Sequence, residues 1–254
     1  MTTGDPFRVD GAVALVTGAA TGIGAAIARA LANAGADVAC HGNSRPADAT
    51  CDAIRKVGKK AISLQADLAD KKSAAALVEA TLKEFGQVDV LVNNAGLIRR
   101  APAVDYSDAD WQLLLEVNLS SVFRLCQLAG RVMLEQKRGK IVNVASLLSF
   151  QGGVFVPAYA ASKGGVAQLT KALANEWASK GVNVNAIAPG YIRTTNTEAL
   201  QKDETRNRQI LERIPAGRWG DAEDIAGAAV YLSSKASDYV NGHVLVVDGG
   251  WMSR

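Results

Sequence analysis

Tyr159 and Lys163 are the two residues whose types and spacing point most directly to proton-transfer chemistry. If residues 158–179 form a helix, as their sequence predicts, the two side chains leave the same face on neighbouring turns. An ammonium group beside a phenol stabilises the phenolate, so we expect the tyrosine pKa to fall from its reference value of about 10. Ser146 follows the apolar run 141–145, where its hydroxyl could bond a substrate oxygen whose charge changes during reaction. Such a pair on a helix is also a common surface contact, so its meaning depends on the surrounding elements.

Those elements alternate regularly along the chain. Strands are predicted at 13–17, 37–41, 61–65, 88–92, 140–145, 182–187 and 243–247, and helices at 23–34, 46–57, 71–85, 107–136, 158–179 and 221–233. This alternation predicts an α/β fold with a seven-stranded parallel sheet and helices on both faces, a doubly wound arrangement. No repeat or linker divides residues 1–254, so a single domain is expected. The polar stretch 191–216 interrupts the pattern and is expected to be an irregular substrate lid.

Composition excludes several classes of function. Lys and Arg number 28 against 25 Asp and Glu, a balance that argues against a nucleic-acid partner or a membrane surface. No apolar run approaches the length of a membrane span, and the first residues lack a secretory signal pattern. The scattered Cys40, Cys51 and Cys126 indicate small buried residues in a reducing cytoplasm. Neither His41 nor His243 has a partner at metal-ligand spacing, so no metal is expected.

A glycine-rich turn joins the first predicted strand to the first predicted helix. Its glycines, Gly18, Gly22 and Gly24, would permit a tight turn, and the helix N-terminus would present free N–H groups to a pyrophosphate. An ordinary glycine-rich turn is the alternative, but the position between strand and helix favours a dinucleotide. The candidate cofactor residues, which cluster after predicted strand ends, are Gly18, Thr21, Gly22, Ile23, Gly24, Asn43, Ser44, Arg45, Asp67, Leu68, Asn94, Ala95, Gly96, Tyr159, Lys163, Pro189, Gly190, Ile192 and Thr194.

The end of the second strand bears on the choice between NAD and NADP. Sheets of this kind usually carry an acidic residue there for the ribose hydroxyls, but this chain has Gly42 at that position. Arg45 could bind a ribose 2′-phosphate, or it could be a solvated loop residue. We expect an aspartate at Gly42 to shift cofactor preference toward NAD.

Asn118 lies inside the predicted helix 107–136 among apolar neighbours. Asparagine is a poor helix former, so a buried one needs hydrogen-bond partners. It is either a satisfied core amide or an anchor for a water molecule leading to the active site.

These parts occur together in the order and spacing of one family. The chain resembles the short-chain dehydrogenase/reductase family through Thr17-Gly18-x3-Gly22-Ile23-Gly24, Asn93-Asn94-Ala95-Gly96, Asn118, Ser146, Tyr159-x3-Lys163 and Pro189-Gly190. The resemblance implies a single Rossmann-like domain, a nicotinamide cofactor and usually a homotetramer. It also implies that Tyr159 is the acid/base, that Ser146 orients the substrate oxygen, that Lys163 holds the nicotinamide ribose, and that Asn118 completes a proton relay.

Blocks near the expected active site resemble one branch more closely. Residues 94–100, 148–153, 188–191, 213–220 and 238–242 are similar to the 2-dehydro-3-deoxy-D-gluconate 5-dehydrogenase (2-deoxy-D-gluconate 3-dehydrogenase) branch. That branch acts on keto-deoxy sugar acids and mostly uses NAD, although residues 42–45 here leave NAD or NADP open. The expected substrate is therefore a small anion, and its candidate ligands are Ser146, Gln151, Tyr159, Arg99, Arg100 and Arg193.

Two other functions are compatible with the same motifs. The catalytic set equally permits reduction of 3-oxoacyl thioesters or another ketone. A catalytically idle dinucleotide sensor is possible, although it would have no chemical need for Asn118, Ser146, Tyr159 and Lys163 together. Residues 243–251 are too apolar for an exposed sheet edge, so association with other subunits is expected in either case.

Overall fold

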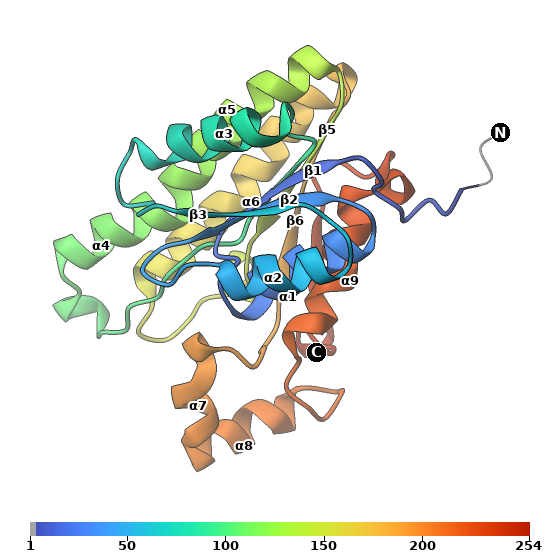
Figure 1. The fold of residues 1–254 in the computed structure, drawn as a ribbon. Coiled ribbons are helices and arrows are strands. Elements are labelled where there is room, and N and C mark those ends of the chain that lie inside the picture. The colour runs from blue at the N-terminus through green and yellow to red at the C-terminus, as the bar shows by residue number, and fades with distance from the viewer. Residues whose placement is uncertain (1–3) are drawn as a thin grey trace.

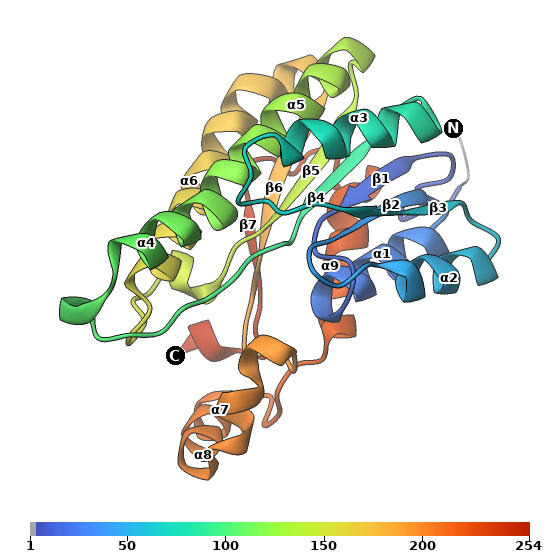
Figure 2. The ribbon, with the colours of Figure 1, turned by 60° about the vertical axis from the view of Figure 1, so that its left-hand side comes forward.

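The computed structural model describes residues 4–254, apart from the side chain of Asn196; residues 1–3 of the expected domain lie outside the described part. The strands are β1 (Val13–Val16), β2 (Asp37–Gly42), β3 (Ala61–Gln65), β4 (Val90–Asn93), β5 (Gly139–Val144), β6 (Val182–Pro189) and β7 (Val244–Val247). All neighbours pair in parallel in the order β3-β2-β1-β4-β5-β6-β7 (Figures 1 and 2). The predicted seven-stranded parallel sheet is confirmed, and each predicted strand is found within two residues of its expected bounds.

The strands form where apolar residues run without interruption. Every residue of Val13–Val16 and of Val90–Asn93 is buried, as expected for strands that are covered on both faces. The two faces support separate apolar clusters, one around Leu15 and Leu91 and the other around Val16 and Ile27. The alternation of side chains along each strand divides the core in this way.

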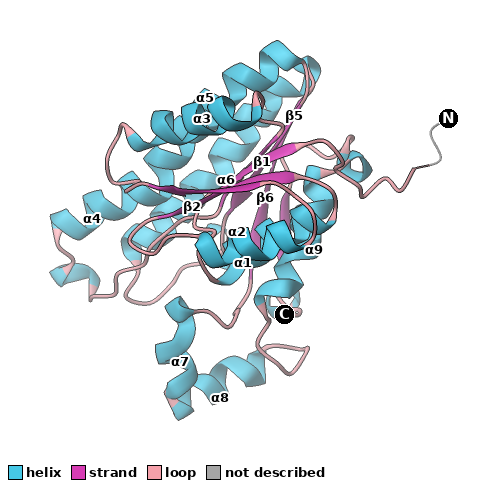
Figure 3. Ribbon diagram, viewed as in Figure 1, coloured by secondary structure: helices cyan, strands magenta, loops and turns pink. Residues whose placement is uncertain are grey.

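Helices cover both faces of the sheet, as predicted. One face carries α3 (Ser73–Phe85), α4 (Asp108–Leu115), α5 (Ser121–Gln136) and α6 (Pro157–Trp177) (Figures 1 and 2). The other carries α1 (Gly22–Asn33), α2 (Asp48–Lys56) and α9 (Ala222–Ser233), and Figure 3 shows both layers around the strands. This is the doubly wound arrangement, which brings the carboxyl ends of all the strands to one edge.

The predicted helix 107–136 is not continuous. A π-helical turn at Glu116–Ser120 separates α4 from α5. Asn118 lies in the middle of that turn, and its side-chain amide bonds the backbone of another segment. Asparagine competes with regular helical bonding, and π turns of this kind occur often at functional sites.

The expectation of an irregular segment at 191–216 was wrong in part. It contains a 3₁₀ turn at Thr195–Thr197 and two helices, α7 (Glu198–Lys202) and α8 (Glu204–Arg213). Asp203 caps α8 by accepting a bond from the Arg206 amide, a signal that the weak apolar periodicity conceals. We call residues 191–216 the α7–α8 segment. It projects beyond the sheet beside the C-terminal end of the chain (Figure 2).

Candidate active site

The site begins where strand order reverses, between β1 and β4. Thr17 joins these strand ends: its amide donates to Val92 O at 3.0 Å, and its hydroxyl accepts from the amides of Asn94 and Ala95 at 3.0 Å each. The Asn94 side chain returns two bonds to the carbonyls of Thr17 and Gly18. The crevice at such a switch point is where open α/β sheets bind ligands.

Close packing explains two glycines of the turn after β1. Gly18 has φ +65°, and a Cβ there would lie 2.8 Å from Asn94 Nδ2. A Cβ on Gly24 would lie 2.2 Å from Gly18 O, so the helix could not approach the loop. The first turn of α1 contains no acidic residue, and Thr21 makes no side-chain cap, which leaves amide donors available to an anion.

His41 holds this glycine-rich loop in place, a role that sequence reasoning missed. Its ring lies between two backbone groups, with Nδ1 accepting from the Gly18 amide at 3.3 Å and Nε2 3.0 Å from Ala66 O. The second contact requires a proton on Nε2, so this arrangement needs the neutral ring. Burial lowers the His41 pKa, while the bond to Ala66 and the charge of Asp67 oppose the shift.

We expect dinucleotide affinity to fall on acidification through this histidine. The depressed pKa keeps the folded ring neutral, so the effect should begin only below the ordinary value of about 6.5. Protonated His41 cannot accept from Gly18, whereas in His41→Asn the Oδ1 can accept and does not titrate. Calorimetric Kd values for NADH between pH 5 and 8 test this, since NADH lacks a titrating 2′-phosphate. Parallel pH profiles for both proteins would contradict it.

A groove of about 370 Å³ follows the strand ends from the glycine-rich loop to Tyr159. Most of the expected cofactor residues line it: Gly18, Thr21, Gly22, Ile23, Asn43, Ser44, Arg45, Asn94, Ala95, Gly96, Tyr159, Lys163, Pro189, Gly190, Ile192 and Thr194. Gly24, Asp67 and Leu68 do not. Gly24 lies beneath the loop, Leu68 is buried, and Asp67 is exposed with its Oδ1 accepting from the Ala69 amide.

Gly42 has no room for a side chain in this conformation of the groove. A Cβ there would lie 2.1 Å from Arg45 O, so an acidic residue would require movement of the loop 43–45. Arg45 lines the groove and has no carboxylate partner within residues 4–254. The local charge is therefore positive where NAD-specific sheets place an acid.

Tyr159 and Lys163 lie on the first two turns of α6, which begins with Pro157 at a favourable N-terminal position. The Lys163 ammonium is 5.7 Å from the centre of the Tyr159 ring and donates to Val144 O at 2.6 Å. Ser146 Oγ accepts from the Leu148 amide at 3.1 Å, which leaves its own proton to donate. The three side chains meet at the end of β5, as predicted, in the groove lining.

The pKa values differ from the expectation for this pair. Burial raises the pKa of Tyr159, while its interaction with Ser146 and the charge of Arg100 act in the opposite direction. Burial also lowers the pKa of Lys163 to about 8. The expected depression of the tyrosine pKa by Lys163 is thus not found, because desolvation outweighs the nearby charges.

Asn118 is fully buried and connects the end of β4 to α6. Its Oδ1 accepts from the Leu97 amide and its Nδ2 donates to Leu97 O, both at 2.9 Å. The same Nδ2 lies 3.3 Å from Ser162 Oγ, which donates to Tyr159 O at 2.8 Å. The side chain is therefore a satisfied core amide that orders the surroundings of Tyr159. A role in a proton relay remains a proposal.

A second cavity, of about 670 Å³, opens beside the groove under the α7–α8 segment. The two share Ser146, Tyr159, Pro189, Gly190 and Thr197, so a molecule in one would lie beside a molecule in the other near Tyr159. Among the described residues that line this second cavity, none is aspartate or glutamate. A cavity whose described lining residues include no carboxylate favours an anionic substrate.

The cavity lining separates the arginines that were expected to bind substrate. Arg100 lines the cavity, as do Ser146, Gln151 and Tyr159. Arg99 and Arg193 do not: Arg99 lies 3.6 Å from Asp110, and Arg193 lies 3.0 Å from Asp221. Exposed pairs of this kind turn the two guanidinium groups away, and the positions do not support a substrate role for either residue.

The lining also contains arginines and aromatic residues that were not predicted as ligands. Arg206 and Arg213 come from α8, Tyr191 follows β6, and Trp251 comes from the C-terminal end. The two arginines are seven residues apart, which places them on one face of a helix. This spacing predicts a shared cationic face only if residues 204–213 are first recognised as a helix.

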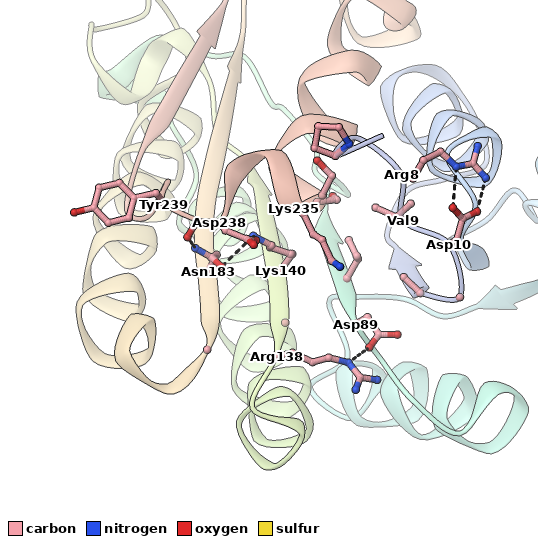
Figure 4. Close-up of a pocket in the computed structure, with 18 of the residues that line it drawn as sticks. Arg8, Val9, Asp10, Asp89, Arg138, Lys140, Asn183, Lys235, Asp238 and Tyr239 are labelled. Carbon is pink, nitrogen blue, oxygen red and sulfur yellow. Dashed lines mark hydrogen bonds and ion pairs between the residues drawn. The ribbon is translucent and has the colours of Figure 1, made fainter. Parts of the chain in front are cut away.

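A larger cavity, of about 1120 Å³, lies at the opposite edge of the sheet, at the amino ends of β1, β4, β5 and β6 (Figure 4). Its charged side chains largely neutralise each other: Arg138 pairs with Asp89 at 3.0 Å, and Lys140 with Asp238 at 2.7 Å. None of the predicted site residues lines it. Size alone therefore does not identify the reactive cavity.

Residues 4–254 also bear on metal binding and membrane insertion. No cluster of three or more His, Cys, Asp or Glu side chains in this range is arranged to hold a metal ion. No helix in the same range is both long and apolar enough to cross a membrane.

Comparison with known proteins agrees with this geometry. The family model described as enoyl-(acyl carrier protein) reductase matches residues 18–252. A 2-dehydro-3-deoxy-D-gluconate 5-dehydrogenase of Bacillus subtilis is 56% identical over 250 residues, 98% of each chain. A structure from Agrobacterium tumefaciens, described as a 2-deoxy-D-gluconate 3-dehydrogenase with bound NADP, is also 56% identical. It has a TM-score of 0.93 and covers 99% of this chain and 100% of its own.

A gluconate 5-dehydrogenase from Burkholderia cenocepacia, in complex with NADP and tartrate, is 39% identical with a TM-score of 0.93 over 98% of both chains. The matches extend over nearly the whole chain and include the glycine-rich loop and the Tyr159–Lys163 helix. The chain belongs to the short-chain dehydrogenase/reductase family.

Proposed function

We propose that the protein is an NAD(P)-dependent oxidoreductase that transfers hydride between the nicotinamide and a secondary alcohol or ketone of a keto-deoxy sugar acid. The observation that carries this proposal is the cavity beside Tyr159, which three arginines and no described carboxylate line. Its similarity to 2-dehydro-3-deoxy-D-gluconate 5-dehydrogenases supports the same substrate class.

The groove fits a dinucleotide on two counts. Side chains on Gly18 or Gly24 would collide with Asn94 and the loop backbone, so these glycines permit the tight turn after β1, and the start of α1 offers amide donors to the phosphates. Arg45 and Lys163 give the groove two cations, with no described carboxylate in its lining. When bound, the cofactor supplies or accepts the hydride.

The proton accompanying the hydride is assigned to Tyr159. Tyr159 lines both the groove and the cavity, so we assign its hydroxyl the role of donating to the substrate oxygen in reduction and accepting in oxidation. Ser146 is free to donate its proton to the same oxygen, because its own acceptor bond is satisfied by Leu148. Lys163 supplies a nearby positive charge and further N–H donors for a ribose. Asn118 is assigned to a proton relay in the same region.

We further propose that the site accepts NADP through Arg45. The groove residue at the second strand end is glycine, and the related Agrobacterium and Burkholderia structures contain NADP. An arginine near that position can bind a ribose 2′-phosphate.

Arg45→Ala is expected to lower kcat/KM for NADP about tenfold or more and to change it little for NAD, since only NADP carries the extra phosphate. Steady-state assays with both cofactors measure this ratio, and Arg131→Ala, an exposed residue of α5, is the control. An unchanged ratio would contradict the assignment.

Gly42→Asp should still favour NAD, but kcat/KM should fall for both cofactors, because the new Cβ would displace the Arg45 backbone.

A substrate panel tests the function itself. 2-Dehydro-3-deoxy-D-gluconate, D-gluconate and a 3-oxoacyl thioester are each assayed with NAD(H) and NADP(H) by nicotinamide absorbance. The sugar acids should have the highest kcat/KM. Preference for the thioester would establish the acyl-reductase alternative, and cofactor binding without turnover of any compound would favour a dinucleotide sensor.

We also propose a cytoplasmic homotetramer. β7 is an edge strand, and Leu245, Val246 and Val247 remain partly exposed, as does Phe123 on α5. Such surfaces are commonly covered in symmetric assemblies. Buried free thiols at Cys40, Cys51 and Cys126 suit a reducing compartment. Sedimentation at micromolar concentration should show a tetramer, and a monomer would contradict this.

A further inference from the structure

The three arginines of the substrate cavity are not equally ordered. All three belong to exposed residues, and within residues 4–254 the Arg206 side chain bonds only the neighbouring Gln209 side chain, at 2.8 Å. Arg213 is different, because its guanidinium carbon lies 4.1 Å from the centre of the Trp251 ring. A guanidinium held over an indole keeps its plane fixed while its N–H groups stay available at the edge.

Trp251 is itself held rigidly. It is 5% exposed, and its ring centre lies 4.6 Å from that of Tyr191. Its Nε1 lies 3.4 Å from Gln151 Oε1, so the indole joins the loop after Ser146 to the α7–α8 segment. A buried aromatic residue with its polar atom bonded has little rotamer freedom. Arg213 is therefore stacked on a fixed surface.

The helix that carries Arg213 is anchored at two further points. Trp219 Nε1 donates to Asn207 Oδ1 at 2.7 Å, and Trp219 packs edge-on against Tyr191 with ring centres 5.4 Å apart. At the other end of α8, the Arg254 side chain donates to the carbonyls of Glu212 and Arg213. These contacts orient α8, so that Arg206 and Arg213, two turns apart, both reach the cavity lining.

The arginines also differ in which tyrosine their charges affect. The charge of Arg100 acts on the pKa of both Tyr159 and Tyr191. Arg206 and Arg213 act on Tyr191, where their effects exceed that of Arg100, and neither is among the causes of the Tyr159 shift. The cavity thus has a reactive end at Tyr159 and a strongly cationic end at Tyr191.

We propose that Arg213, stacked on Trp251, is the residue that binds the substrate carboxylate, with Arg206 as a second ligand and Trp251 as the residue that positions the guanidinium. This assignment rests on the proposed function and specifies how it selects substrates. A planar guanidinium matches a carboxylate through two parallel hydrogen bonds. Because Arg213 is held on Trp251 beside Tyr191, we expect the enzyme to prefer sugar acids whose reacting carbon is several bonds from the carboxylate over short 2-hydroxy acids.

The test compares a sugar acid with its uncharged counterpart. Arg213→Ala should raise KM for 2-dehydro-3-deoxy-D-gluconate about 10- to 100-fold, the range expected for loss of a charge-assisted hydrogen bond, and change KM for its C1 amide little. Arg213→Lys should restore only part of the loss, since lysine neither stacks as a plane nor binds bidentately. The control is Arg208→Ala, on the same helix but outside the cavity lining and 3.9 Å from Glu212.

Trp251 is tested by graded substitution. Trp251→Phe keeps a ring for stacking, so it should raise KM for the acid less than Trp251→Leu does, with kcat affected less than KM in both. A merely structural role would lower kcat and Tm alike, whichever substrate is used. Thermal unfolding and cofactor Kd verify that each variant is folded.

The outcomes separate this inference from the function on which it rests. If the wild-type enzyme turns over no sugar acid, the proposed function is wrong. Wild type that is active, with equal losses for acid and amide in Arg213→Ala, contradicts the carboxylate assignment alone. Calorimetry adds a readout without turnover. D-gluconate should bind the holoenzyme more weakly after Arg213→Ala, whereas the Kd of D-glucitol should be unchanged by the substitution. An unchanged Kd for D-gluconate would overturn the inference.

Discussion

Tyr159→Phe is expected to lower kcat about 10³-fold, within the range by which general acid–base groups accelerate proton transfer. The phenol oxygen is the only part removed, and it belongs to a residue that lines both the groove and the substrate cavity. The ring remains, so its packing on α6 and the 5.7 Å approach of Lys163 to its centre should persist. Cofactor affinity should therefore be nearly unchanged. The loss should appear in kcat and in kcat/KM alike, as for an interaction that acts in the transition state.

Single-turnover kinetics measure the rate of the catalytic step, and cofactor titration measures the cofactor affinity separately. Tyr231→Phe on α9 is a matched control, because it removes a phenol oxygen outside both cavity linings. A Tyr159→Phe enzyme with wild-type kcat would show that the proton comes from another group.

Lys163→Met should lower kcat about 10²-fold and also weaken cofactor binding, which distinguishes it from the tyrosine variant. Methionine fills the same elongated space, so the packing of α6 should survive. What is lost is the ammonium, which donates to Val144 O at 2.6 Å and belongs to a residue that is 5% exposed. Without that cation, the groove loses a positive charge and the N–H donors proposed for the ribose, so cofactor titration should show a higher Kd beside the fall in kcat.

Although Lys163→Met should harm activity, it should not lower the stability of the fold. Burial lowers the Lys163 pKa to about 8 from 10.5, so the native state disfavours the charged form. This cost to stability is fully present below pH 8 and disappears as the pH rises toward the unfolded value. At pH 7 the Tm of Lys163→Met should be no lower than that of wild type, and the difference should shrink above pH 8. Lys171→Met, exposed on the same helix, is the control. A large fall in Tm would contradict this account of the buried charge.

The sequence by itself determined the sheet, its cofactor edge and the reactive pair, because each depends on contacts within a short stretch of chain. Uninterrupted apolar runs such as Val13–Val16 define buried strands, and alternation with amphipathic helices leaves the parallel topology as the solution. Helical spacing places Tyr159 and Lys163 on one face wherever the helix lies. The glycines after β1 are explained locally by the tight turn and the close helix.

Only the tertiary structure decided which groups face the substrate and how they titrate. Arg99, Arg100 and Arg193 are similar in sequence context, yet two of them pair outward with Asp110 and Asp221 while Arg100 lines the cavity. These partners lie up to 28 residues away, and spacing along the chain says nothing about such encounters.

The same limit applies to groups whose properties depend on burial. His41 meets Gly18 and Ala66 through the pairing of three strands, and Arg213 meets Trp251 across 38 residues. The Tyr159 pKa rises because desolvation in the folded site exceeds the influence of nearby charges. Helical spacing indicates that two side chains are neighbours, but the dielectric surroundings that set their proton affinities exist only once the sheet, α6 and the α7–α8 segment have come together.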